Sequence, residues 1–192
     1  MNRSLTQEQK GFTLIELLVV IAILAVLAVV VLLVLNPAQL LRQTRDSNRL
    51  QDLDTINRVL NLYMADVSTP SLGNAGNCYA HSSSTLTDCT DRFVSGTPSL
   101  STGIATDGTG WIPVNFNNIS AGSPISKLPK DPVNNATYYY AYRADPVAGA
   151  YEINARMESN KFGSGGGSDV VTDDGGDNAD LYEIGNKPVF TL

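Results

Sequence analysis

The sequence predicts an α+β fold, in which a long amino-terminal helix is followed by a small antiparallel sheet. An uninterrupted apolar run at residues 17–35 leads into a stretch with helical spacing of apolar residues that ends at Val67. Residues 138–192 then contain short segments, some with alternating apolar and polar side chains, separated by turn residues. A helix followed by consecutive strands is typical of the α+β class.

Residues 12–35 are predicted to form a membrane-spanning helix. Such a helix is roughly 36 Å long at about 1.5 Å per residue, which exceeds a hydrocarbon core of about 30 Å. Glu16 is the one ionisable residue inside it. Because a charge is expensive to bury in lipid, Glu16 is a candidate functional residue. Arg3 and Lys10 place the segment before the helix on the cytoplasmic side, so we expect everything after Leu35 to lie outside.

Residues 36–67 are predicted to continue as an amphipathic helix that needs a domain to pack against. Its apolar face carries Leu50, Leu53, Ile56, Leu60, Tyr63 or Met64, and Val67. Its opposite face is expected to carry Arg49, Asp52, Asp54 and Arg58. Pro37 lacks a backbone donor, and we expect it to kink or loosen the helix near residues 33–36.

The rest of the chain divides into two parts. Residues 68–137 are predicted to be a loop-rich connection with one short strand at 112–116. Cys78 and Cys89 are the only cysteines, and an even count in an exported chain predicts a disulfide, with two free thiols as the alternative. Residues 138–192 are predicted to form the sheet, with strands at 138–143, 151–156, 181–184 and 189–192.

The start of the apolar segment carries the most specific motif. It reads Lys10-Gly11-Phe12-Thr13-Leu14-Ile15-Glu16. This motif resembles the class III signal of type IV pilins and pseudopilins, whose fold is the expected one. The resemblance implies that a prepilin peptidase removes residues 1–11 by cutting between Gly11 and Phe12, and then methylates Phe12. Pairing of the Glu16 carboxylate with a neighbour's new amino group would neutralise a buried charge and drive assembly.

The acidic, glycine-rich loop at residues 159–180 is a candidate metal site. Hard cations such as calcium take six to eight oxygen ligands. We expect the calcium ligands to be Asp173, Asp174, Asp177 and Asp180. The segment 173–180 is similar to the calcium-binding loop of major pseudopilins. The alternative is an acidic loop that is simply solvated.

No enzymatic activity is predicted, because the chain lacks a phosphate loop, a dinucleotide fingerprint and a nucleophile elbow. The formal net charge of −6 and the lack of a basic patch argue against direct binding of nucleic acid.

The expected function is that of a structural subunit of a type IV pilus or pseudopilus, polymerised through its amino-terminal helix. Its expected partners are further copies of itself, other pilins, the prepilin peptidase, the membrane and the pilus assembly platform. We expect it in the cytoplasmic membrane before assembly and in an extracellular or periplasmic filament afterwards. The alternatives are a minor pilin or adhesin-type binding subunit, and a plain single-pass membrane-anchored extracellular domain. The motif is common to filaments for motility, adhesion, DNA uptake and secretion.

Overall fold

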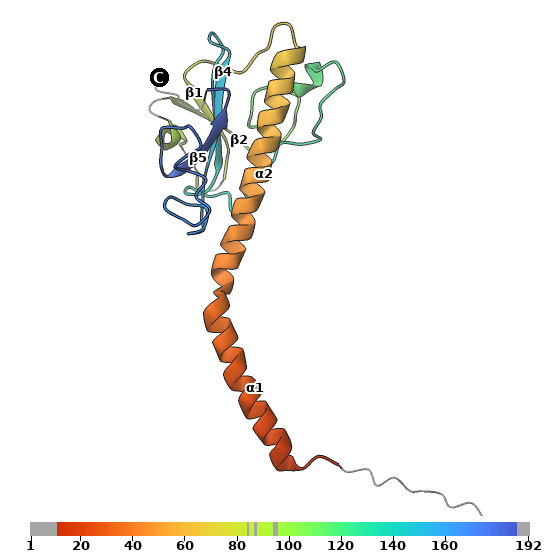
Figure 1. Ribbon diagram of the computed structural model, residues 1–192. Coiled ribbons are helices and arrows are strands. Elements are labelled where there is room, and N and C mark those ends of the chain that lie inside the picture. Colours follow the sequence, from red (N-terminus) through yellow and green to blue (C-terminus); the bar gives the residue numbers. More distant parts are fainter. Residues whose placement is uncertain (1–10, 84, 87, 94–95, 188–192) are drawn as a thin grey trace, which may run out of the picture. The chain divides into compact units, whose positions relative to one another are not determined.

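The computed structural model describes residues 11–83, 85–86, 88–93 and 96–187. It confirms the predicted α+β class, with helices followed by a five-stranded sheet (Figure 1). The chain divides into two compact units, the second of which begins at Leu41.

The first unit contains helix α1, Leu14–Leu35. Its segment Leu14–Leu32 is long and apolar enough to cross a membrane, by length and composition. The helix ends at Asn36, whose backbone is left-handed with a φ of 39°. Pro37 then starts α2 at the first helical position, where a missing N–H is tolerated. The helix was predicted to loosen near Pro37, and it is in fact interrupted at one residue, Asn36.

Helix α2, Pro37–Asp66, buries one face. The buried residues recur every three or four positions and are Asp46, Arg49, Leu53, Ile56, Val59, Leu60 and Tyr63. The prediction that Arg49 lies on the solvent face is wrong, because its side chain is fully buried. Hydrophobic periodicity assigns a charged residue to solvent, whereas here carboxylates from distant segments surround the guanidinium.

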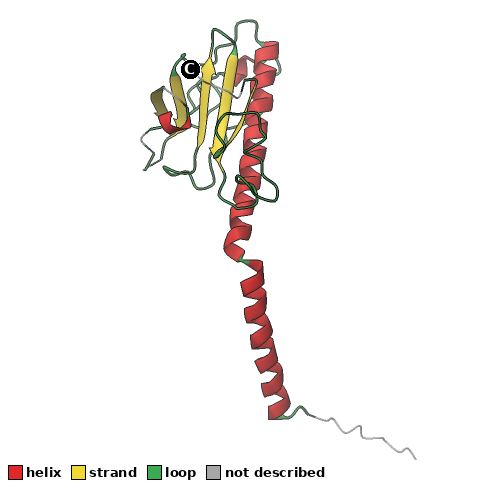
Figure 2. Cartoon of the chain, turned by 60° about the vertical axis from the view of Figure 1, so that its left-hand side comes forward, coloured by secondary structure: helices red, strands yellow, loops and turns green. Residues whose placement is uncertain are grey.

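The sheet has the strand order β2-β1-β3-β4-β5. Figure 2 shows its strands in yellow. The strands are β1 Asn77–His81, β2 Thr97–Ser101, β3 Tyr140–Asp145, β4 Ala150–Arg156 and β5 Leu181–Gly185. All neighbours pair antiparallel except β1 and β2, which are parallel.

Two of these strands fall in the range predicted to be loop. β1 and β2 lie inside residues 68–137, and the short strand predicted at 112–116 is wrong. Asn115 makes only an isolated bridge to Asp107, and a short 3₁₀ helix follows at Phe116–Asn118. The strand predicted at 189–192 lies outside the described residues.

Helix α2 packs on one face of the sheet through an apolar core that is rich in tyrosine. Burial of these rings leaves hydroxyl groups that need partners. Tyr140 donates to the Asp52 carboxylate at 2.8 Å, and Tyr151 donates to the Asn57 side chain at 2.6 Å. The hydroxyl groups therefore fix where the sheet lies along α2.

Arg49 joins three segments that are distant in the sequence. Its Nε and Nη2 donate to the two Asp131 oxygens at 2.6 and 2.9 Å. Its Nη1 donates to Asp46 at 2.7 Å, and its Nη2 lies 2.6 Å from Oε1 of Glu158. Burial alone would lower the pKa of Arg49, but these carboxylates raise it above its ordinary value. Arg49 is therefore charged at any pH at which the protein is folded.

Glu158 follows β4 and attaches this end of the sheet to α2. Arg45 donates to both of its oxygens, at 2.9 and 2.5 Å. Asp46 accepts the backbone N–H groups of Glu158 and Ser159 at 2.9 and 2.8 Å. Burial raises the pKa of Glu158, but the hydrogen bonds from Arg45 and Arg49 outweigh burial and lower it.

Replacing Arg49 by Met should lower the free energy of unfolding by about 3–5 kcal/mol, because it leaves buried carboxylates without a counter-charge. Urea unfolding in detergent micelles, followed by the fluorescence of Trp111, the sole tryptophan, measures the change. The matched control is Arg58→Met, which removes an exposed pair with Asp54 and should cost less than about 1 kcal/mol. Equal losses in the two variants would contradict the assigned role of Arg49.

Glu158 should also make the free energy of unfolding decrease as the pH falls. A carboxyl group whose pKa is lower in the folded state stabilises the fold above its unfolded pKa, here 4.5, and loses that effect as the pH falls through the folded value. Between pH 7 and pH 3, the melting temperature of Glu158→Gln should decrease less than that of the wild type. An equal decrease in the two proteins would show that other carboxyl groups cause the loss of stability in acid.

Candidate functional site

The predicted cleavage position lies just before α1, in a non-helical segment. Gly11, Phe12 and Thr13 precede the helix, and the Phe12 side chain is 91% exposed. A Cβ added to Gly11 would meet no atom within 4 Å. Exposed, irregular segments are where proteases reach the backbone most readily. The Gly11–Phe12 bond is therefore accessible, and the helix that must stay intact begins two residues beyond it.

Thr13 and Glu16 form a capping box at the start of α1. The Thr13 backbone N–H donates to Oε2 of Glu16 at 2.8 Å, and the Thr13 hydroxyl donates to the same oxygen at 2.7 Å. The Glu16 N–H in turn donates to the Thr13 hydroxyl at 3.3 Å. These bonds hold the carboxylate at the first turn, where it also satisfies backbone donors that have no partner in the helix.

The sequence reasoning identified Glu16 but missed Thr13. The signal was present, because a Thr followed three residues later by a Glu at the head of an apolar run is the sequence form of a capping box. Glu16 remains exposed in the chain, so its carboxylate is open to a second partner.

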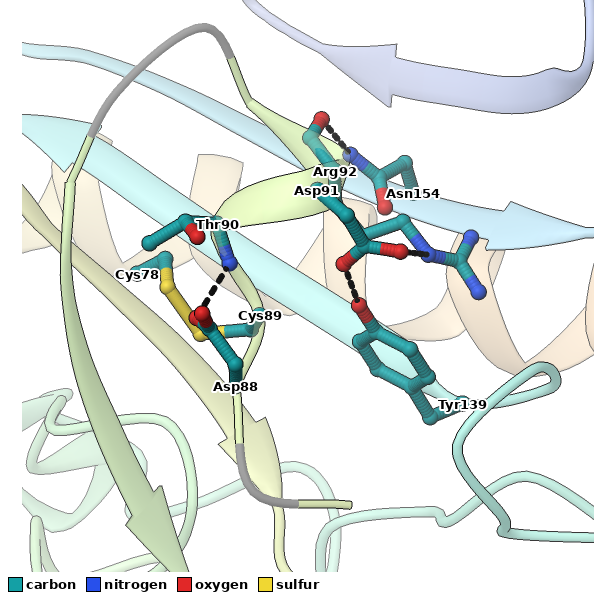
Figure 3. Close-up of a disulfide and its surroundings, with 8 residues drawn as sticks. All are labelled: Cys78, Asp88, Cys89, Thr90, Asp91, Arg92, Tyr139 and Asn154. Atoms are coloured by element: carbon teal, nitrogen blue, oxygen red, sulfur yellow. Dashed lines mark hydrogen bonds and ion pairs between the residues drawn. A yellow bond between two sulfur atoms is a disulfide. The ribbon is translucent and has the colours of Figure 1, made fainter.

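Cys78 and Cys89 form a disulfide with an S–S distance of 2.05 Å (Figure 3). Cys78 lies in β1, and Cys89 precedes a short 3₁₀ helix, Thr90–Arg92. Both cysteines belong to a second small core with residues that include Leu86 and Phe93. This core covers the face of the sheet opposite α2.

Polar groups surround the disulfide on this second face (Figure 3). The Tyr139 hydroxyl donates to the Asp91 carboxylate. The Arg92 guanidinium lies 4.1 Å from the centre of the Tyr139 ring, and its Nη2 donates to the Thr137 carbonyl at 2.7 Å. Asn154 donates to the Arg92 carbonyl at 3.3 Å. The short 3₁₀ helix that follows Cys89 is thus attached to the residues before β3 and to β4 by side chains that sequence reasoning did not identify.

The acidic loop folds back onto β5 through Asp174. Its carboxylate accepts the N–H groups of Gly176 and Glu183 at 2.8 and 2.6 Å. Asp180 lies 3.8 Å from Arg156, while Asp173 and Asp177 are exposed. Within the part of the chain that the structure describes, no three acidic, histidine or cysteine side chains converge to hold a metal ion. This arrangement does not fit the six to eight oxygens of a calcium site, and calcium binding stays a prediction.

Thermal unfolding of the protein with calcium or with EGTA tests that prediction. Calcium held only by the folded chain would raise the melting temperature by mass action, and Asp177→Asn would abolish the rise. Asp54→Asn, on the solvent-facing side of α2, is the control and should keep it. Equal melting temperatures with calcium and with EGTA would remove calcium from the account.

Residues 7–32 match the family model described as the prokaryotic N-terminal methylation motif. The match contains Gly11, Phe12, Thr13 and Glu16, together with most of α1. No curated protein and no solved structure matches the chain. Its amino-terminal segment therefore matches the class III prepilin signal of type IV pilins and pseudopilins.

Proposed function

We propose that this chain is a structural subunit of a type IV pilus or pseudopilus. It is cut between Gly11 and Phe12, methylated at Phe12 and polymerised through α1. The observation that carries this proposal is the Thr13–Glu16 capping box at the head of an apolar helix, one turn beyond an accessible Gly11–Phe12 bond.

Helix α1 needs an apolar environment on every side. The large apolar residues whose side chains the structure describes are each about half exposed or more, and they occur all round the helix. A helix that is apolar all round is stable when lipid or other helices cover it. Lipid supplies this cover before assembly, with the amino terminus on the cytoplasmic side, and the helices of further copies or other pilins supply it in the filament.

Glu16 then provides the interaction that favours the filament over the membrane. Cleavage leaves Phe12 with an α-amino group whose ordinary pKa is about 8, so it is positively charged at neutral pH. In lipid, the bonds from Thr13 only partly replace the hydration of the Glu16 carboxylate. A neighbour displaced by about 6 Å, or four residues, along the helix axis brings its Phe12 amino group level with Glu16. The resulting ion pair exists only between subunits.

The test separates the charge of Glu16 from its capping bonds. Glu16→Gln keeps an oxygen that can accept from Thr13 but removes the charge, and it should reduce the filament yield at least tenfold. Thr13→Val keeps the charge and removes the hydroxyl, and it should reduce the yield less. Immunoblots of sheared filaments and of membranes measure the two pools.

The mass of the amino-terminal peptide is the control for processing. Each variant should begin with a methylated Phe12, which shows that the peptidase acted and that only assembly changed. Normal filament yield from Glu16→Gln would overturn the role of the charge. An intact Met1 start in wild-type protein, from cells that contain the peptidase, would instead favour a plain membrane-anchored domain.

A further inference from the structure

A cavity of about 180 Å³ lies on the face of the sheet opposite α2, beside the disulfide loop. It is lined by Asp91, Arg92 and Phe93 from the segment after Cys89, by Glu152 in β4 and Glu183 in β5, and by Asp177 and Asn178 in the acidic loop. Three segments that are far apart in the sequence thus meet at one hollow. Its volume is below the roughly 300–1,000 Å³ of pockets for drug-sized ligands, so it suits a single small ring.

Two buried carboxyl groups, Glu152 and Glu183, belong to this cavity. They are 1% and 2% exposed. Glu183 pairs with Asn154 and Glu152 with Gly185, so both glutamates lie on the same face of neighbouring strands. Burial raises the pKa of Glu183, and the nearby acidic groups Asp174 and Asp177 raise it further. The Asn178 N–H also donates to Glu183, at 2.9 Å.

Arg92, which lines the same cavity, has buried donors that are unsatisfied. The residue is 3% exposed. Its Nε and Nη1 have no hydrogen-bond partner among the described residues, although the Asp91 carboxylate lies 4.0 Å from Nε. A buried donor without a partner costs about 1–3 kcal/mol, and guanidinium groups present several donors in a fixed plane. A ligand that accepts hydrogen bonds from Arg92 removes that cost.

The mixture of groups selects the ligand chemistry. The carboxyl groups of Glu152, Glu183 and Asp177 repel an anion. A compact cation would leave the Arg92 donors unused and would lie against a positive charge. A hydroxyl group both donates and accepts, so a neutral ring with several hydroxyls can bind to the arginine and to the carboxylates at once. Phe93 supplies an apolar surface for the carbon face of such a ring.

We propose that this cavity binds one pyranose sugar, either free or as the terminal unit of a glycan. Sugar binding goes beyond a purely structural role, and it is independent of filament assembly through α1.

Saturation-transfer NMR tests the proposal on the full processed chain in lauryldimethylamine oxide micelles, a detergent without a sugar headgroup. The probes are glucose, galactose, mannose and N-acetylglucosamine, each also as its methyl glycoside, with open-chain sorbitol as the control. At least one pyranose should show saturation transfer with a millimolar Kd, and sorbitol should show none. Binding of the methyl glycoside would indicate a glycan end, and binding of the free sugar alone would indicate a free sugar.

Two variants assign the binding to this cavity. Arg92→Lys keeps the charge but removes the planar set of donors, and it should weaken binding at least tenfold. Phe93→Leu keeps apolar volume but removes the flat ring, and it should also weaken binding. The matched control is Arg58→Lys on exposed α2 surface, which should leave the Kd unchanged.

The near-UV circular dichroism of each variant shows whether it is folded. If Arg92→Lys does not fold, Phe93→Leu and the exposed rim variant Asp177→Asn carry the test. The proposal is overturned if no pyranose shows saturation transfer to the folded wild type. It is equally overturned if the folded cavity variants bind as tightly as the wild type.

Discussion

Arg49 lies fully buried where α2 meets the segment around Asp131 and the end of β4, and the second unit is organised around it. The cluster contains Arg45 and Arg49 and three carboxylates, which α2, a distant loop and the residue after Met157 contribute. A buried ion pair adds modest net stability, but a buried charge that loses its partners is strongly unfavourable. Alignments of α2 that separate Arg49 from Asp131 are therefore excluded. The tyrosine hydroxyls bonded to Asp52 and Asn57 extend the same alignment along the helix.

Local patterns were sufficient for the amino-terminal site and for part of the sheet. The motif from Gly11 to Glu16 is contiguous, and its meaning does not depend on how the rest of the chain folds. Strand β4 was predictable because Tyr151, Ile153 and Ala155 alternate with polar residues and pack against α2. β1 and β2 show no such alternation, and β2 contains Pro98. They become strands because β1 pairs with both β2 and β3, and no local sequence pattern records this pairing.

The surroundings of a charged residue are hard to predict from sequence for one physical reason. Arg49 is buried because Asp131 lies 82 residues further on and accepts two of its hydrogen bonds. Asp174 was predicted to bind calcium because its loop is acidic, and its oxygens accept the N–H groups of Gly176 and Glu183. The partner of a charge depends on the tertiary fold, so composition alone cannot distinguish a solvated carboxylate, a metal ligand and a structural acceptor.

The two units differ in what they leave for other molecules to complete. Helix α1 exposes large apolar residues all round, so other molecules must cover it, and any pilin-like chain can share that requirement. In the second unit α2 covers one face of the sheet, and the disulfide loop covers the other. The apolar core is thus closed, and a small cavity beside it is lined by Arg92, which has unsatisfied donors. A property particular to this protein, rather than to its amino-terminal helix, is therefore best sought where the segment after Cys89, β4 and β5 meet.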